Sequence, residues 1–395
     1  MIDLSLILGR EDNFFSSDIQ KHYDEINEIV RNSSSLVIGG AGCIGQATVK
    51  EIFKRGPKKL YVVDLSENNL AELVRDLRSS IGYIKGDFRT FAIDVGSYEF
   101  ELFLQAEGPF DYILNLSALK HVRSERDPYT LMRMIYVNIC NIARNIEYAE
   151  PMGLKKYFSV STDKAANPVN LMGATKRIME LLLYSRSDTI QVSTARFANV
   201  AFSDGSLLHG FNQRLMKDQP IAAPNDVKRY FITPEESGRL CMLSAILGEN
   251  RDVFFPKFQE SFHLVDFQSI AEEYLKQQGY EPYRCKDEEE ARRKVVELKG
   301  TGKWPCFFSA SNTTGEKAFE EFYTTDEKVI TDRFHEIGVV VNEKFERASV
   351  DSFLKSIEAM RTSRSWTKEE LIEQISMIVP ELVHEEKNFY LDGKM

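Results

Sequence analysis

Cysteine is scarce in this sequence, with five among 395 residues and none in a CxxC or Cys/His pattern. An odd number of widely separated thiols excludes a disulfide framework, and the missing spacing gives no sign of a zinc site. We therefore expect reduced thiols, a cytoplasmic location and no bound metal. The five cysteines are Cys43, Cys140, Cys241, Cys285 and Cys306.

Long apolar runs and an excess of positive charge are also missing. No apolar stretch approaches the roughly 18 residues that cross a bilayer, and the N-terminal residues carry neither a basic start nor a small-residue cleavage site. Sixty acidic residues against fifty basic ones give a net charge of −10, so no diffuse positive field holds a polyanion. These absences predict no membrane insertion and no nucleic-acid binding.

Short β-branched runs separated by helical stretches make up the first half of the chain. This alternation is typical of an α/β protein in which helices cover both faces of a parallel sheet. We predict a Rossmann-type doubly wound parallel sheet with a smaller C-terminal substrate-binding lobe and extra terminal helices. The apolar runs are 36–38, 60–63, 112–114, 157–160 and 190–192.

The same patterns suggest four parts of the chain. Apolar residues at helical spacing come before and after the alternating region, and turn-rich segments follow residue 202. Thr367 stands where a helix N-cap is expected. The expected parts are an N-terminal helical arm (1–33), an NAD-binding Rossmann domain (34–202), mainly a substrate-binding lobe (203–348) and a C-terminal helical extension (349–395).

A glycine-rich turn links the first apolar run to the first helix of the Rossmann pattern. Gly39, Gly42 and Gly45 allow a tight turn, close approach of a pyrophosphate and close helix packing. Around Cys43 and Ile44 the start of the helix offers unpaired N–H groups. The alternative is a purely structural turn, but its place between strand and helix favours dinucleotide binding.

Carboxylates follow the second and third strands of this pattern. Asp64 stands about twenty residues after the last glycine, where it can accept hydrogen bonds from the adenosine ribose. Because Asp64 repels a 2′-phosphate and Leu65 brings no cation, NAD is favoured over NADP. Asp94 and Val95 are candidates for adenine contacts, although a strand-end Asp is equally a turn residue.

The segment 158–183 carries the candidate chemistry. Asp163 and Lys164 follow a buried strand at the carboxyl end, where doubly wound sheets bind their ligands. Together they offer a proton donor and a proton acceptor. Lys176 lies on the following helix, four residues after Met172 on the same face. The alternative, an ordinary turn pair, is disfavoured by the glycine turn upstream.

With these motifs the chain resembles the nucleotide-sugar 4,6-dehydratases of the extended short-chain dehydrogenase/reductase superfamily, in the polysaccharide-biosynthesis branch that acts on UDP-N-acetylglucosamine. The glycine spacing, Gly-x-x-Gly-x-x-Gly, is the form found in that superfamily. The matching segments run in family order over about residues 34 to 345: GGAGCIG (39–45), NLSALKHV (115–122), STDKAANPVNLMGATKR (161–177), ARFANVAFSDGSLL (195–208), RYFIT (229–233) and TGEKAFEE (314–321).

The resemblance implies a redox-neutral elimination with tightly held NAD. In such enzymes hydride leaves C4 of the sugar, water is lost across C5 and C6, and the hydride returns to C6. At the matching positions Asp163 is the expected acid at the C6 oxygen and Lys164 the base at C5. Thr162 is then the hydrogen-bond partner of the C4 hydroxyl, and Lys176 binds the nicotinamide ribose.

Two positions depart from the family pattern. The usual Tyr-x-x-x-Lys reads Met172-Gly-Ala-Thr-Lys176, so the phenol that takes the C4 hydroxyl proton is missing. This resembles the subgroup that retains the C5 configuration, on routes to sugars like bacillosamine or legionaminic acid. Thr162 through a water, or Asp163 itself, remain the alternatives as proton acceptor. At 313–317 the sequence TTGEK stands where relatives have RPGEK, which removes one expected phosphate contact.

Contacts with a nucleotide sugar are expected from Lys120, Asn199 and Arg229. Asn199 and Arg229 match positions that bind the nucleotide diphosphate in similar enzymes, and an arginine fork can bridge phosphate oxygens. His121 is favoured as a structural residue over a general base. The nucleotide base, UDP or GDP, stays open, as does the role of residues 281–305. Similar enzymes form dimers or hexamers, so a homo-oligomer is expected.

Two other functions remain alternatives. A nucleotide-sugar 4-epimerase shares the cofactor and the C4 hydride step but needs neither an acid at C6 nor a base at C5, so the Asp163–Lys164 pair argues against it. A non-catalytic NAD-binding scaffold is favoured by the missing tyrosine, but it does not account for an acid–base pair at the ligand edge of the sheet.

Overall fold

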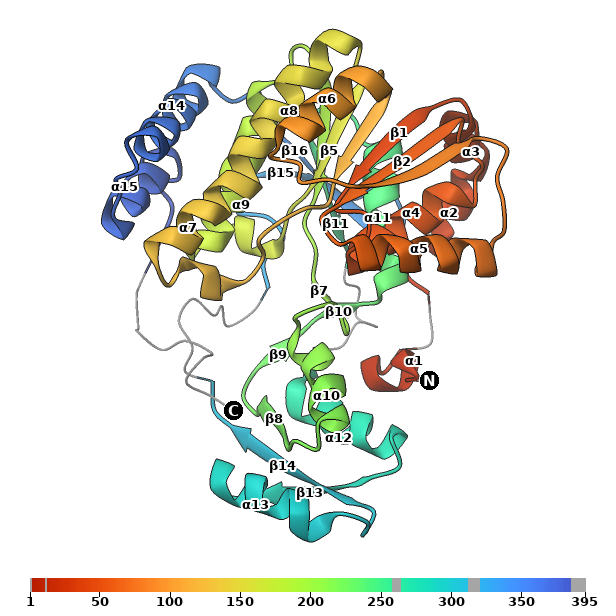
Figure 1. The fold of residues 1–395 in the computed structure, drawn as a ribbon, viewed down its shortest axis with the longest axis vertical. Helices are drawn as coiled ribbons and strands as arrows, with labels where there is room; N and C mark the ends of the chain where they lie inside the picture. The colour runs from red at the N-terminus through yellow and green to blue at the C-terminus, as the bar shows by residue number, and fades with distance from the viewer. Residues whose placement is uncertain (1, 11–12, 258–263, 312–319, 385–395) are drawn as a thin grey trace.

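A nine-stranded sheet forms the centre of the protein in the computed structural model, which describes residues 2–10, 13–257, 264–311 and 320–384 (Figure 1). Its strand order is β15-β16-β11-β6-β5-β4-β1-β2-β3. The seven strands from β11 to β3 are parallel, whereas β16 and β15 are antiparallel to their neighbours. The predicted doubly wound Rossmann sheet is therefore confirmed.

The five β-branched runs found in the sequence form β1, β2, β4, β5 and β6. The buried runs of β1, β5 and β11 have no exposed residue, as expected for parallel strands covered on both faces. The bounds are β1 Ser34–Ile38, β2 Lys59–Asp64, β3 Asp87–Ala92, β4 Tyr112–Asn115, β5 Lys156–Val160, β6 Gln191–Ala195, β11 Asp252–Pro256, β15 Lys328–Ile330 and β16 Ile337–Val341.

Helices cover both faces of the sheet (Figure 1). On one face α11 packs against α4, with α5 alongside, and on the other α6 packs against α8, with α7 and α9 alongside. A short π-helical turn, Tyr136–Cys140, joins α7 to α8. The bounds are α4 Cys43–Phe53, α5 Glu67–Ser80, α6 Tyr98–Glu107, α7 Pro128–Ile135, α8 Asn141–Ala149, α9 Leu171–Ser185 and α11 Pro234–Leu247.

A smaller lobe lies below the carboxyl ends of the parallel strands (Figure 1). Its three-stranded parallel sheet has the order β13-β14-β8, and a separate apolar cluster that includes Leu208, Phe211 and Tyr274 fills it. Residues 281–305 supply two of these strands and a charged helix. The bounds are α10 Leu207–Met216, β8 Ile221–Pro224, β9 Lys228–Arg229, β12 Val265–Asp266, α12 Phe267–Gln277, β13 Glu281–Cys285, α13 Glu288–Leu298 and β14 Lys303–Ser309.

Residues 203–348 do not all belong to this lobe. The segments that form α11, β11, β15 and β16 return to the central sheet, so the chain crosses between the two parts more than once. Two short strands, β7 Asn199–Val200 and β10 Phe231–Ile232, pair where the chain crosses. The boundary expected at residue 202 lies close to one of these crossings, after β7.

The terminal helices pack on the body of the protein. The first, α1 Leu4–Leu8, contacts α12 of the small lobe, and α3 Tyr23–Arg31 contacts α11 after α2 Ser16–Lys21. At the other end α14 Arg347–Ser363 and α15 Lys368–Ile378 lie against α9, and α15 also contacts α7. Thr367 caps α15 in a capping box with Glu370, which confirms the predicted N-cap.

Two absences hold for the described part of the chain. None of its helices has both the length and the apolar character to span a membrane. Within the same residues no group of three or more His, Cys, Asp or Glu side chains could hold a metal ion.

Candidate active site

The glycine turn between β1 and α4 has the geometry of a phosphate cradle. Gly39 has φ +71°, and a Cβ there would lie 2.7 Å from the backbone N of Ser117. A Cβ on Gly45 would overlap the carbonyl oxygen of Gly39. Gly42 is the N-cap of α4 with no side-chain cap, so the N–H groups at Cys43 and Ile44 start the helix without a side-chain acceptor. Such a helix end suits an anion.

Asp64 ends β2 beside this turn. Its Oδ2 accepts a hydrogen bond from the Ala41 N–H at 3.0 Å, and its Oδ1 accepts one from the Ser66 N–H at 2.9 Å. The carboxylate is therefore held against the glycine turn. The glycine spacing, the uncapped helix and this carboxylate together fit a dinucleotide with a free ribose.

Asp94 follows β3 and has turn contacts. It accepts from the Gly96 N–H at 2.8 Å and lies 3.6 Å from the Arg133 guanidinium. Val95 is partly buried against the apolar core. The turn interpretation accounts for the observed Asp94 contacts, and its contact with adenine stays a prediction.

Thr162, Asp163 and Lys164 form one connected group at the carboxyl end of β5. The Lys164 Nζ lies 3.1 Å from Asp163 Oδ1 and 3.4 Å from Oδ2. The Thr162 hydroxyl donates to Asp163 Oδ1 at 2.8 Å and also caps the short turn by accepting from the Lys164 N–H. Asp163 is 4% exposed, whereas the Lys164 side chain is 30% exposed, so a buried acid is paired with a partly exposed amine.

Lys176 lies behind this group on α9. Its Nζ donates to the carbonyl oxygen of Val160 at 3.0 Å, at the end of β5. Burial lowers the pKa of Lys176 to about 8, against the opposing effect of the Glu180 charge. Met172 is buried in the first turn of α9, and its N–H donates to Glu125 Oε2 at 3.3 Å. No hydroxyl stands at that position.

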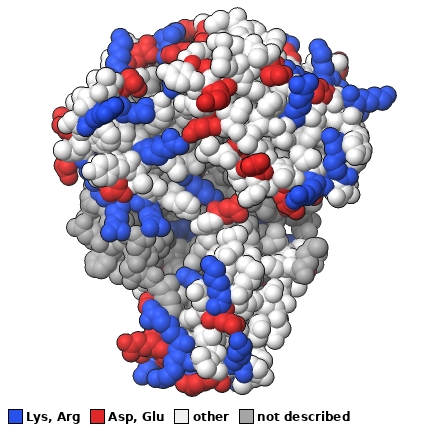
Figure 2. Space-filling view, in the orientation of Figure 1, with Lys and Arg blue, Asp and Glu red and all other residues white. Residues whose placement is uncertain are grey.

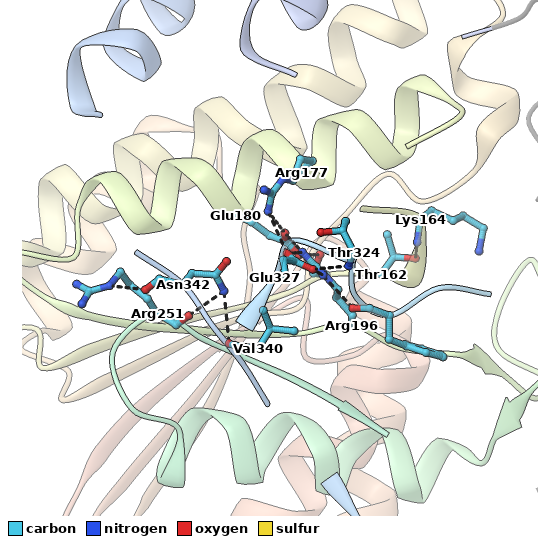
Figure 3. A network of polar contacts seen from close by, with 12 residues as sticks. Thr162, Lys164, Arg177, Glu180, Arg196, Arg251, Thr324, Glu327, Val340 and Asn342 are labelled. Carbon is cyan, nitrogen blue, oxygen red and sulfur yellow. Dashed lines mark hydrogen bonds and ion pairs between the residues drawn. The ribbon is translucent and has the colours of Figure 1, made fainter. Parts of the chain in front are cut away.

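A buried ion-pair network fixes the strand end from behind (Figure 3). Arg196, which has no exposed surface, donates to Glu180 Oε2 at 2.7 Å and to both carboxylate oxygens of Glu327. Glu180 also accepts from Ser161 Oγ at 2.6 Å. Ser161 directly precedes Thr162, so the network ties the reactive strand end to α9 and to the segment after residue 320.

Lys120 lies in the charge environment of the glycine turn. Burial lowers the pKa of Lys120, and the neighbouring Cys43 and Asp204 oppose that shift. Burial, together with the positive charges of Lys120 and Arg123, lowers the pKa of His121. Gly205 lies against the His121 ring, because a Cβ there would come within 2.8 Å of it. His121 is an exposed residue, and its structural role stays a prediction.

Asn199 and Arg229 lie on crossing strands, and sequence reasoning missed the carboxylate that accompanies them. Asn199 Nδ2 donates to Glu320 Oε1, and the Tyr230 N–H donates to Glu320 Oε2 at 2.7 Å. The charges of Asp163, Lys164 and Arg229 all act on Glu320. The motif at 314–321 contains Glu320, but nothing in the sequence places it beside Asp163. Residues 313–317, where TTGEK departs from RPGEK, lie outside the described residues.

The surface is hollowed between the sheet domain and the small lobe on the face that Figure 2 shows. Acidic and basic side chains are interspersed over this face, with no patch of a single sign. The carboxyl ends of β1, β2 and β5, which carry the groups described above, face the small lobe (Figure 1).

Comparison with known proteins decides the family. Residues 35–342 match the polysaccharide biosynthesis protein family. The chain belongs to this family. The match spans more than half of the chain and confirms the resemblance that the motifs indicated.

The individual relatives named here are each less than 30% identical to this chain. An uncharacterized membrane protein of Methanocaldococcus jannaschii is 29% identical over 80% of this chain and 88% of its own length. The capsular polysaccharide biosynthesis protein CapD of Staphylococcus aureus is 27% identical over 84% of this chain, which spans only 50% of CapD. An inverting UDP-N-acetylglucosamine 4,6-dehydratase of Campylobacter jejuni is 27% identical over 56% of this chain and 66% of its own.

Solved structures confirm the fold. Pen from Bacillus thuringiensis has a TM-score of 0.64 at 22% identity, covering 89% of this chain and 98% of Pen. The dTDP-glucose 4,6-dehydratase DesIV from Streptomyces venezuelae, solved as a double mutant with NAD bound, has a TM-score of 0.56 at 15% identity, covering 85% of this chain and 99% of DesIV. These likenesses confirm a Rossmann-type α/β fold.

Proposed function

We propose that this protein is an NAD-dependent nucleotide-sugar 4,6-dehydratase acting on UDP-N-acetylglucosamine or a GDP-sugar analogue. The observation that carries the proposal is the partly buried Asp163–Lys164 contact of 3.1 Å at the carboxyl end of β5. An epimerase of the same fold has no use for an acid and a base beside the sugar's C5 and C6. Relatives named as UDP-N-acetylglucosamine 4,6-dehydratases support the same substrate class.

The glycine turn, the uncapped start of α4 and Asp64 would hold the dinucleotide. Bound NAD supplies a reversible hydride acceptor, which takes hydride from C4 and returns it to C6. Asp64 favours a free ribose hydroxyl over a 2′-phosphate, and Leu65 offers no cation for a phosphate. Lys176 would bind the nicotinamide ribose and bring positive charge close to the C4 step.

Proton movements are assigned to the group at the end of β5. Thr162 Oγ1 lies 2.8 Å from Asp163 Oδ1, so a proton that leaves the C4 hydroxyl has a route through Thr162 to Asp163. Asp163 then gives this proton to the C6 oxygen, which departs as water. Lys164, as the neutral amine, takes the C5 proton, and the resulting ammonium, whose side chain is 30% exposed and exchanges protons with solvent, supplies a proton to C5 when hydride reaches C6. Every proton is accounted for, and the sugar loses one water.

This route also replaces the missing tyrosine. Met172 cannot accept a proton, and the Thr162–Asp163 hydrogen bond supplies an acceptor without it. We propose that the product retains the C5 configuration, as in the Met-x-x-x-Lys subgroup, although the Campylobacter relatives are named as inverting. Lys120, Asn199 and Arg229 would contact the nucleotide diphosphate end of the substrate.

Turnover in heavy water tests the proposal. The purified protein is incubated with UDP-N-acetylglucosamine, and in parallel with a GDP-hexose, and products are followed by mass spectrometry and NMR. Loss of water with deuterium at C5 is expected, and the proton couplings of the product report the C5 configuration. Interconversion at C4 without water loss would establish an epimerase instead. Bound NAD with no change in any nucleotide sugar would establish a scaffold.

A further inference from the structure

The N-terminal arm contacts both parts of the protein. Its first helix, α1, lies beside the small lobe, whereas α2 and α3 lie beside the sheet domain (Figure 1). Ile7 and Leu8 of α1 are buried in the apolar cluster of the small lobe. Phe14 and Phe15, which precede α2, are buried in the core of the sheet domain. One short stretch of chain is therefore packed into both parts, and Arg10 stands between its two buried ends.

Arg10 forms a bidentate ion pair with Glu236. Its Nη1 donates to Glu236 Oε1 at 2.6 Å, and its Nη2 donates to Oε2. The Glu236 side chain is 1% exposed and that of Arg10 is 11% exposed, so water and salt screen this pair little. The same carboxylate accepts from the Phe14 N–H at 2.9 Å and from the Thr233 N–H at 2.7 Å. Because Thr233 and Glu236 form the capping box of α11, Arg10 holds the arm to the start of that helix.

Arg10 also binds the strand by which the chain leaves the small lobe. Its Nη2 donates to the carbonyl oxygen of Phe231 in β10 at 3.2 Å. Alternate carbonyls of β10 accept hydrogen bonds from β7, namely those of Tyr230 and Ile232. The Phe231 carbonyl lies on the other edge of the strand, where Arg10 satisfies it. Phe231 stands opposite Asn199 in this strand pair, so Arg10 acts on the strands that carry an expected substrate contact.

We propose that Arg10 is a positioning residue for the substrate contacts at the crossing between the two parts. It holds β10 in place and keeps the arm of the small lobe at the start of α11, and so fixes the spacing at which Asn199 and Arg229 contact a nucleotide sugar. The identity of that ligand rests on the proposed function. A site built from two parts binds more tightly when their relative position is fixed beforehand, because less freedom is lost on binding.

Two substitutions and one control separate the guanidinium from the rest of the arm. Arg10→Met removes the guanidinium and keeps most of the apolar stem. Arg10→Lys keeps the charge, but one ammonium cannot reproduce the fork that binds both Glu236 oxygens and the Phe231 carbonyl. Arg31→Met is the matched control, since Arg31 is an exposed arginine of the same arm. Tm is measured for all three. Should Arg10→Met not fold, both measurements are made on Arg10→Lys.

Hydrogen exchange tests the role of Arg10 at the crossing strands without relying on catalysis. The N–H groups of Asn199 and Ala201 donate to β10, and they exchange when the two strands separate. In Arg10→Met these amides should exchange about tenfold faster than in the native chain, because the strands open more often. The amides of β1, in the middle of the sheet, should keep their rates, and Arg31→Met should match the native chain. Unchanged rates at Asn199 and Ala201 in Arg10→Met overturn the proposal.

Steady-state kinetics tests the role in substrate binding. Arg10→Met is expected to raise KM for UDP-N-acetylglucosamine by about tenfold and to change kcat less than about twofold, since binding weakens and the acid–base pair is intact. NAD affinity should not change, because the glycine turn and Asp64 belong to the sheet domain. A lower Tm with an unchanged KM means a merely structural role and overturns the proposal. If the native chain dehydrates no nucleotide sugar, the proposed function fails by itself, and hydrogen exchange still decides whether Arg10 holds the crossing strands.

Discussion

Lys164 Nζ lies 3.1 Å from Asp163 Oδ1 in a contact between neighbouring residues, so the same turn presents an amine and an acid in one place. Asp163 is held on its other side by the Thr162 hydroxyl at 2.8 Å. Because Lys164 is 30% exposed while the Asp163 side chain is 5% exposed, the amine reaches further toward solvent than the acid.

Substitutions in this pair should separate chemistry from cofactor binding. Asp163→Asn and Lys164→Ala are each expected to reduce water loss by at least 10²-fold, the usual contribution of a positioned acid or base. The glycine turn and Asp64 are unchanged, so bound NAD should remain. Mass spectrometry of the reaction measures the loss of water, and the absorbance of released cofactor measures how much NAD the protein holds. Normal turnover in either variant contradicts the assigned roles.

The sequence was most informative where a local pattern sets the structure. Short β-branched runs predicted β1 and β2, the glycine spacing predicted the turn between β1 and α4, and the Asp163–Lys164 pair was visible as a candidate because the two residues are adjacent. Glu320 was missed because its hydrogen bonds with Asn199 and Tyr230 join positions that lie far apart in the chain. The return of β11 and β16 to the sheet was missed for the same reason, since pairing across the lobe is a long-range property.

Lys176 should destabilise the fold at neutral pH. Burial lowers its pKa to about 8, so the unfolded chain binds the proton more tightly, and native stability rises as pH increases from 8 toward the ordinary lysine value of 10.5. Lys176→Met is expected to raise Tm at pH 7, with a gain that shrinks between these two pH values, and to abolish turnover. Lys58→Met, at an exposed position, is the control. A gain that does not change with pH would contradict the buried-amine explanation.

Arg196 should contribute more to stability than a surface arginine. Removing it leaves Glu180 fully buried and Glu327 largely buried without their main partner. Breaking such a buried pair costs about 3–5 kcal/mol, so Arg196→Met should lower the free energy of unfolding by that amount. Arg89→Met is the comparison, since Arg89 is 53% exposed beside Asp87 and an exposed pair contributes about 0–1 kcal/mol. Urea unfolding measures the free energy of unfolding of both variants. An equal loss of stability in the two would contradict the importance of the network around Arg196.

Asp64 and Leu65 should decide between NAD and NADP. Asp64 is held beside the glycine turn, where its charge opposes a 2′-phosphate, and Leu65 is 65% exposed next to it. Asp64→Ser combined with Leu65→Arg replaces the repulsion by a cation. We expect the NADP to NAD preference to rise by about 10²-fold, measured as the ratio of the two dissociation constants, because two charge changes act on one phosphate. An unchanged ratio would place the ribose elsewhere.

Replacing Gly42 by alanine and replacing Gly45 by alanine should have different effects on Tm and on NAD binding. A Cβ on Gly45 would overlap the Gly39 carbonyl and the backbone of Gly40, none of which can move without opening the turn, so Gly45→Ala should lower Tm and prevent cofactor binding together. A Cβ on Gly42 would meet only the Gly39 oxygen, at 3.7 Å, so Gly42→Ala should fold with a nearly unchanged Tm. Its methyl group would stand at the helix start where a pyrophosphate has to approach the backbone, and NAD affinity should fall by at least tenfold.

Tm by calorimetry and NAD binding by titration are measured on both variants. If Gly42→Ala binds NAD as tightly as the native chain, the dinucleotide does not lie against the start of α4, because a pyrophosphate there cannot avoid the added methyl group.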